Sequence, residues 1–120
     1  MNREIKFRAW HKTYKKMFKI GQLTLKKGSW NYEPKDKEFI GMSIPYQSDF
    51  ILMQYTGLKD KNGVDIYEGD ILRDYGNEIE DWVVSYEYGK FIGTFDNVCE
   101  DLYEISDFEV IGNIYENEVD

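Results

Sequence analysis

The sequence predicts a mainly β protein, built as a small barrel or roll with one short helix. Three observations support this prediction. Aromatic residues form 17% of the 120-residue chain and include ten Tyr, and their flat rings pack well on the pleated surface of a sheet. Short apolar runs alternate with polar residues at a period of two. Turns that contain Gly separate these runs at short intervals, which is typical of small all-β folds.

The N-terminal part is expected to form a β-hairpin lobe over residues 1–49. From residue 5 the chain alternates between a core face and an outward face. A polar turn over 11–16 leads into a second strand over 17–25, which Gly21 interrupts. Residues 26–49 lack a sustained period and predict a loop in which Phe39 and Ile40 pair briefly. The predicted core face of the first strand holds Ile5, Phe7 and Ala9, and its outward face holds Lys6, Arg8 and Trp10.

Residues 50–120 are expected to form the barrel or roll, starting with strands over 50–56, 64–67 and 70–74. Asn62 and Gly63 predict a tight hairpin in which both central residues take positive φ. Because Gly63 directly follows Asn62, the acidic residues around this pair do not have the spacing of a calcium loop. The side chain of Asp70 is expected to accept backbone N–H bonds. The residues predicted to specify the turns of the fold are Gly57, Asn62, Gly63, Gly69, Asp70 and Gly112.

Two antiparallel strands are predicted over 82–88 and 91–95. Asp96 or Asn97 is expected to cap a short helix that follows them. A final strand would cover 108–115, with a bulge at Gly112. The residues expected to share one face of the first of these strands are Trp82, Val84, Tyr86 and Tyr88, and those expected to recur on the helix are Val98, Leu102 and Ile105.

The net charge of −8 conceals opposite charges in the two halves of the chain. Residues 1–60 hold 12 Lys and Arg against 6 Asp and Glu, whereas residues 61–120 hold 3 Lys and Arg against 17 Asp and Glu. The halves should therefore attract each other, within one chain or between subunits. We expect a homo-oligomer on this ground.

The sequence shows no catalytic or cofactor-binding constellation. His11 and Cys99 are the only residues of their types, so the usual zinc tetrad or nucleophile–base set cannot be assembled from one chain. We expect Cys99 to be a small core residue. A single Cys fits a reducing compartment, and no apolar run approaches the ~20 residues of a membrane span. The sequence thus predicts a cytoplasmic protein with no cofactor, no metal, no membrane segment and no enzymatic activity.

Three patches of the chain are similar, in order and spacing, to the YopX-like family of small bacteriophage and prophage proteins. They are Arg3–Trp10 with Lys15–Met17, Met53–Gly63 with Ile66–Ile71, and Val110–Asn117. The chain departs from similar proteins at His11, where Asp is common, and at Glu118, where an Asn-Pro step is usual. The resemblance implies an SH3-type barrel or roll in the C-terminal part, a phage or prophage origin, and no established activity.

We expect the N-terminal lobe to pack against the barrel and the protein to be a non-enzymatic accessory module in the bacterial host cytoplasm. It would act through protein–protein contacts, with further copies of itself or with a host or phage protein, and the hairpin tip at 59–65 is one predicted contact. An alternative is nucleic-acid binding through the basic N-terminal lobe. An acidic mimic of nucleic acid and a small metal-dependent hydrolase are further alternatives. The candidate nucleic-acid-binding residues are Lys6, Arg8, Trp10, Lys12, Lys15 and Lys16.

Overall fold

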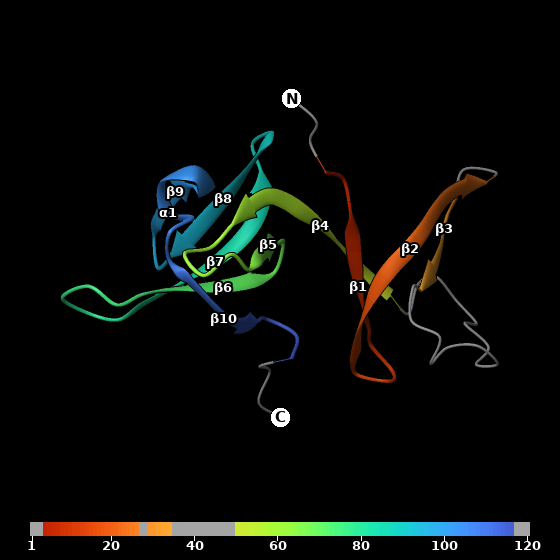
Figure 1. Cartoon of the computed structure of the whole chain (residues 1–120), viewed down its shortest axis with the longest axis horizontal. Coiled ribbons are helices and arrows are strands. Elements are labelled where there is room, and N and C mark those ends of the chain that lie inside the picture. The colour runs from red at the N-terminus through yellow and green to blue at the C-terminus, as the bar shows by residue number, and fades with distance from the viewer. Residues whose placement is uncertain (1–3, 27–28, 35–49, 117–120) are drawn as a thin grey trace. The chain divides into compact units, whose positions relative to one another are not determined.

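The computed structural model describes residues 4–26, 29–34 and 50–116 (Figure 1). Short strands fill most of these residues, as expected from the alternating sequence, and no helix among them is long and apolar enough to cross a membrane. The elements are β1 (Phe7–His11), β2 (Lys16–Lys26), β3 (Ser29–Pro34), β4 (Phe50–Lys59), β5 (Asp65–Tyr67), β6 (Asp70–Asp74), β7 (Glu80–Glu87), β8 (Lys90–Phe95), β9 (Val98–Asp101), α1 (Leu102–Ile105) and β10 (Glu109–Asn113).

The chain divides into two compact units, one of Lys6–Met53 and the other of Gln54–Asp120 together with Met1–Ile5. The division falls inside β4, so one continuous strand contributes to both units. The expected boundary at residues 49 and 50 lies at the start of this strand. The packing of the N-terminal lobe against the barrel stays a prediction.

The first unit is an antiparallel arrangement in which β1 lies between β2 and β4. β2 also pairs with β3, and the register of this pairing shifts between Ile20 and Gln22, on either side of Gly21. The prediction of a loop is wrong over Ser29–Pro34, because these residues extend the sheet by one strand. The expected pairing of Phe39 and Ile40 lies outside the described residues.

The core of the first unit consists of Ala9, Phe18 and Phe50, with half-buried Ile20 and Leu52 against it. Two predictions for the first strand are wrong. Ile5 precedes β1 and is 69% exposed, whereas Trp10 is only 8% exposed. The consecutive residues Ala9, Trp10 and His11 are all buried. Successive side chains of a strand point to opposite faces, so both faces of β1 are covered at this end and the simple alternation of inward and outward residues breaks down.

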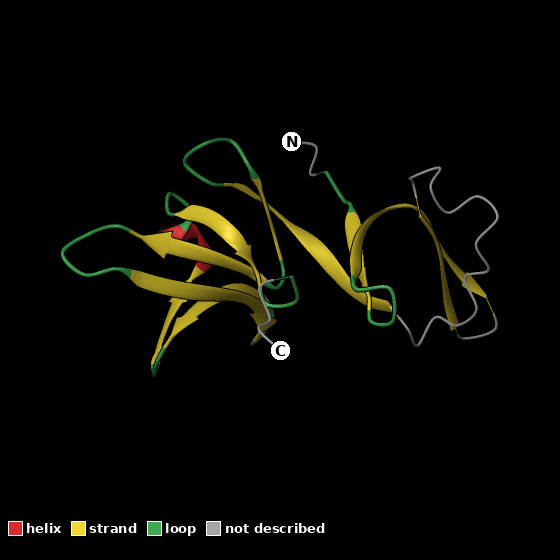
Figure 2. Cartoon of the chain, turned by 90° about the horizontal axis from the view of Figure 1, so that it is seen from below, coloured by secondary structure: helices red, strands yellow, loops and turns green. Residues whose placement is uncertain are grey.

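The second unit contains an antiparallel sheet with the strand order β10-β6-β7-β8-β9. Its strands curl into a half-barrel beside the short helix α1, which is drawn in red in Figure 2. β4 pairs with β5 at the start of this unit. The prediction of a mainly β protein of the small barrel or roll type, with one short helix, is therefore confirmed.

The core of the second unit forms where the half-barrel closes over α1. Leu102 and Ile105, the buried residues of α1, pack with residues of β5, β6 and β7. Gly93 on β8 makes this packing possible, because a Cβ atom at that position would overlap Ile105 Cδ1. The buried residues of this hydrophobic core are Ile66, Leu72, Trp82, Val84, Leu102 and Ile105.

The predicted start of the helix is wrong. Val98–Asp101 forms β9, which is antiparallel to β8: Val98 pairs with Phe95 at one end, and Asp101 pairs with Ile92 at the other. The helix therefore begins only at Leu102. Asp96 lies in the preceding turn with φ 51° and does not cap a helix. Cys99 is exposed rather than buried, because all four residues of this edge strand face solvent.

Candidate functional site

Of the turn residues predicted from the sequence, Asn62, Gly63 and Gly69 lie between strands and Asp70 begins β6. Gly57 and Gly112 lie within β4 and β10, where the pairing register shifts. Gly57, Gly63 and Gly69 have φ values of 89°, 80° and 87°, a region that residues with a Cβ enter only with strain. The register between β10 and β6 shifts beside Gly112. Asp70 Oδ2 accepts a hydrogen bond of 2.7 Å from the Tyr67 backbone N–H. These residues shape the fold, and none of them lines a cavity described below, although Gly57 lies between the lining residues Thr56 and Leu58.

The Asn62–Gly63 turn differs from the predicted two-residue hairpin. Gly63 has positive φ, but Asn62 is not among the positive-φ residues of the described chain. The Gly63 N–H donates to the Asp60 carbonyl at 3.0 Å, and the Asp60 N–H donates to the Val64 carbonyl at 2.8 Å. The connection is thus a three-residue loop that ends on a left-handed glycine, the second common solution for a hairpin.

Asp60, which the sequence did not single out as a structural residue, explains this geometry. It is 7% exposed, and its Oδ1 accepts the backbone N–H groups of Asn62 and Val64 at 2.8 and 2.9 Å. Its Oδ2 accepts the Val110 N–H of β10 at 2.9 Å. Burial by itself would raise the pKa of the Asp60 carboxyl, but the three N–H donors favour the charged form and hold this pKa below its usual value.

The predicted hairpin tip at 59–65 is therefore engaged within its own unit. Besides the contacts of Asp60, Asn62 Nδ2 donates to Glu109 Oε1 at 3.2 Å, and Lys59 Nζ lies 2.6 Å from Asp65 Oδ1. These contacts tie the tip to β10 and to β5. They leave less of it available to a partner than the sequence suggests.

The candidate nucleic-acid residues of the first unit fall into two groups. Trp10 is buried and cannot stack on a base, and Lys6 and Arg8 are half-buried. The remaining candidates are exposed on the turn between β1 and β2, and they are Lys12, Lys15 and Lys16. Within the described ranges, no group of three or more His, Cys, Asp and Glu residues is arranged to hold a metal ion.

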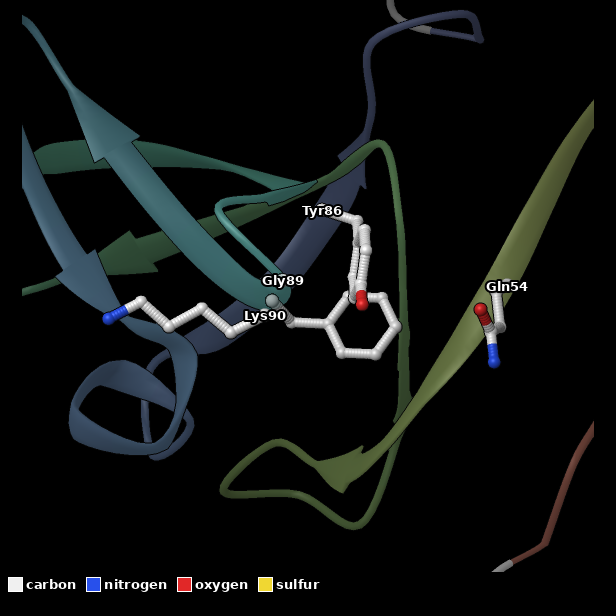
Figure 3. Close-up of a pocket in the computed structure, with 5 residues that line it drawn as sticks. Gln54, Tyr86, Gly89 and Lys90 are labelled. Atoms are coloured by element: carbon white, nitrogen blue, oxygen red, sulfur yellow. The ribbon is translucent and has the colours of Figure 1, made fainter.

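Two cavities meet at Lys90 and Phe91, the first residues of β8. The larger, of about 380 Å³, is lined by Gln54 of β4, Tyr86 of β7 and the turn residue Gly89 (Figure 3). The smaller, of about 290 Å³, lies against Thr56 and Leu58 of β4 and against Asp101, Leu102 and Tyr103. We call the two cavities together the Phe91 groove.

Two exposed tyrosines, Tyr86 and Tyr103, line the Phe91 groove, and the exposed Tyr88 precedes the lining residue Gly89. Tyr86, Tyr88 and Tyr103 are 52%, 86% and 78% exposed. The Tyr86 ring meets the Phe91 ring edge-on, with centroids 5.0 Å apart. Tyr side chains bring a large, stiff contact surface and a polar hydroxyl, which suits them to bind another protein.

Tyr88 and Gly89 form the two-residue turn between β7 and β8, since the flanking residues Glu87 and Lys90 pair directly. Both turn residues have positive φ, 58° for Tyr88 and 76° for Gly89. This is the tight hairpin geometry that the sequence placed at Asn62–Gly63. Tyr lacks the local hydrogen bonds with which Asn and Asp offset this conformation, so Tyr88 adopts it at a cost in local strain.

The charge around the groove is negative. Residues 86–107 hold six Asp and Glu against a single Lys. That residue, Lys90, lies with its Nζ 2.6 Å from Asp101 Oδ1, and both side chains are 55% exposed. The hydrogen bond to Asp101 raises the pKa of Lys90. Asp101 thus neutralises the charge of Lys90, and the remaining Asp and Glu residues make the electrostatic potential around the groove negative.

The sequence contained one signal for this groove. Trp82, Val84 and Tyr86 alternate on β7, and the first two are buried while Tyr86 is exposed. An apolar face that continues past the end of the core leaves its last aromatic ring at the surface. The contributions of Gln54, Thr56 and Leu58 gave no such signal, because only folding brings β4 to the Phe91 groove.

The curled antiparallel strands with one short helix place this chain among small β-barrel or roll proteins. The chain belongs to the YopX protein family, whose model matches residues 6–119. It is also similar to a crystal structure of protein EF1440 from Enterococcus faecalis, with 29% sequence identity and a TM-score of 0.62. That similarity covers 97% of this chain and 96% of the other chain. The search of curated proteins found no match.

Proposed function

We propose that this protein is a non-enzymatic accessory module that binds a protein partner through the Phe91 groove. The resemblance to phage and prophage proteins supports a role inside an infected or lysogenic bacterial cell. The exposed Cys99 fits the reducing conditions of a bacterial cytoplasm.

The observation that carries this proposal is the pair of exposed tyrosines at the margins of a groove whose smaller cavity has an apolar floor. Phe91 and Leu58 form this floor and pack against the core of the second unit. Tyr86 and Tyr103 stand at its margins, each more than half exposed. A rigid aromatic margin around an apolar depression is how binding hot spots are commonly built, because a partner side chain can be desolvated between the rings.

The partner surface expected here is a projecting or extended segment with positive charge. The two cavities of about 380 and 290 Å³ accept single side chains rather than a flat surface. The surrounding acids attract Lys and Arg and repel acidic partners. The groove therefore selects a basic segment that also contains an apolar or aromatic residue.

The test is selection from a displayed peptide library against the full chain, followed by affinity measurements on two variants. The Tyr86→Ala, Tyr103→Ala double variant removes both tyrosines at the margins. Tyr75→Ala is the matched control, since Tyr75 is similarly exposed, at 51%, but does not line the groove. We expect selected peptides to be rich in basic residues and to bind the double variant about tenfold more weakly, as hot-spot tyrosines imply. Equal affinity for all three proteins would overturn the proposal.

Nucleic-acid binding is a second candidate function, favoured by the three exposed lysines of the β1–β2 turn. Lysines neutralise phosphates and release counterions, so such binding weakens steeply with salt. Retention on DNA and RNA at two salt concentrations tests it. The Lys12→Glu, Lys15→Glu double variant should abolish any retention that is due to this turn, and a chain that shows no salt-sensitive retention excludes this candidate.

A further inference from the structure

We propose that the partner segment bound by the Phe91 groove is the β1–β2 turn of a second copy of this chain, so that the protein assembles head to tail. This inference rests on the proposed function of the groove and names its occupant. It depends on three properties of the turn over residues 12–16, which are its projection from the sheet, its rigidity and its charge.

The β1–β2 turn projects from the first unit as an exposed element. All five residues from Lys12 to Lys16 are exposed, while His11 before them is buried and Met17 after them is half-buried. Tyr14, at the centre of the turn, is 47% exposed. A segment of this size suits two cavities that each accept one or two side chains.

The turn is held rigid by His11. The Tyr14 backbone N–H donates to His11 Nδ1 at 3.0 Å, and the Lys15 N–H donates to the His11 carbonyl at 2.8 Å. The His11 ring stacks on the Tyr14 ring with centroids 4.3 Å apart, and it meets the edge of Phe50 at 4.7 Å. A loop that is ordered before binding loses less conformational entropy when it binds.

The turn is strongly basic. Residues 5–32 hold eight Lys and Arg and no Asp or Glu, and three of these lysines lie on the turn itself. Lys16 Nζ also lies 5.5 Å from the centre of the Phe18 ring. The turn therefore combines three exposed lysines with the exposed Tyr14, which is the chemistry that the Phe91 groove selects.

The groove supplies the complementary charge. Glu87, Glu100 and Glu104 are exposed and each is adjacent in sequence to a residue that lines the groove, and Asp101 lies in its wall. Opposite charges of this kind steer association and fix orientation, even where they add little to the final affinity. Every copy of the chain has one basic turn and one acidic groove. Because these are two different surfaces, the contact is heterologous and generates either a closed ring or an open chain.

The experiment measures self-association of the full chain by light scattering and sedimentation at low and high salt. We expect a mass above one chain at low salt and a smaller mass at high salt, since the Debye length falls from about 30 Å at 0.01 M to about 3 Å at 1 M. The turn variant is Lys12→Glu, Lys15→Glu, and the groove variant is Glu100→Lys, Glu104→Lys. Each should weaken self-association about tenfold or more.

Mixing the two variants supplies the decisive measurement. Reversing the charge on both sides restores attraction between the altered turn of one variant and the altered groove of the other, so the mixture should associate more strongly than either variant alone. The Glu78→Lys, Glu116→Lys variant changes net charge by the same amount at exposed sites outside the groove, and it should keep the wild-type mass. Thermal melting verifies that each variant is folded.

Each other outcome has a definite meaning. A wild-type chain that stays monomeric at high concentration overturns this inference, as does a mixture no more associated than its components. If library peptides still bind the groove in either case, the proposed function stands and only the occupant is wrong. If no peptide binds there either, both proposals fail. Loss of nucleic-acid retention in the turn variant, without any change in self-association, assigns the turn to nucleic acid instead.

Discussion

The Asp60 carboxylate accepts a hydrogen bond of 2.9 Å from the backbone N–H of Val110, a residue 50 positions further along the chain. The same side chain caps the turn after β4 through Asn62 and Val64. One carboxylate thus joins the β4–β5 hairpin to β10. We expect this residue to govern the stability of the second unit.

Asp60→Asn should lower the free energy of unfolding by about 2–4 kcal/mol, because the amide group turns one N–H-accepting oxygen into a donor and leaves a buried backbone N–H unpaired. Chemical denaturation measures this loss. Asp107→Asn is the matched control, since Asp107 is exposed, and its effect should stay within about 0.5 kcal/mol. Equal effects of the two substitutions would contradict the role given to Asp60.

The stabilisation by Asp60 should disappear in acid. The pKa of the carboxyl is below the ordinary value of 3.8 in the folded chain, so the folded state favours the charged form. Its contribution is complete above the unfolded pKa and is lost as the pH falls through the lower folded pKa. Unfolding free energies of wild type and Asp60→Asn, measured from pH 6 to pH 2, should begin to converge below about pH 4 and should approach each other further as the pH falls.

Comparison with the Asp60→Asn variant isolates this group from other carboxylates. Arg73 also lowers the pKa of Asp81, through a hydrogen bond of 2.7 Å from Nε to Oδ1. That effect is present in both proteins and cancels in the difference between them. A difference of the same size at pH 6 and pH 2 would count against the assignment to Asp60.

Gly93 and Ile105 should be energetically coupled. A Cβ at Gly93 would overlap Ile105 Cδ1, so Gly93→Ala should cost about 1–3 kcal/mol through overpacking. Ile105→Val removes that same Cδ1 atom and should cost about 0.5–1.5 kcal/mol by itself. The double variant should be clearly more stable than the sum of the two losses predicts. Losses that add within about 0.5 kcal/mol would show that the two sites are independent.

Tyr88→Asn should stabilise the fold and weaken partner binding. Asn tolerates the left-handed conformation that Tyr88 adopts at φ 58°, so the free energy of unfolding should rise by up to about 1 kcal/mol. Denaturation measures the gain, and the affinity for selected library peptides measures the loss. Tyr103→Asn, which relieves no positive φ, should give no gain in stability. A stabilised variant with unchanged affinity would separate Tyr88 from the binding site.

Local pattern accounts for most of the fold that the sequence predicted. The two-residue alternation of Trp82 and Val84 placed β7 correctly, because the face of a strand is a property of neighbouring residues. Gly63 and Gly69 marked turns, because positive φ is a local requirement. Gly57 has positive φ too, but it lies within β4, where the pairing register shifts. Predictions failed where contacts with residues distant in the sequence determine the burial or the secondary structure of a segment. Trp10 is buried like its neighbour Ala9 because tertiary packing covers both faces of β1 there, and Val98–Asp101 is a strand because β8 offers it a partner.

The sequence by itself determined the mainly β class, the positions of the turns, the opposite charges of the two halves and the membership of the family. Tertiary structure decided which residues meet. Asp60 became a link between strands only when β10 came within hydrogen-bond distance. The Phe91 groove exists only because β4, the β7–β8 turn and the start of α1 converge on β8. Pairing over such long sequence separations depends on the whole chain, and so no local pattern encodes it.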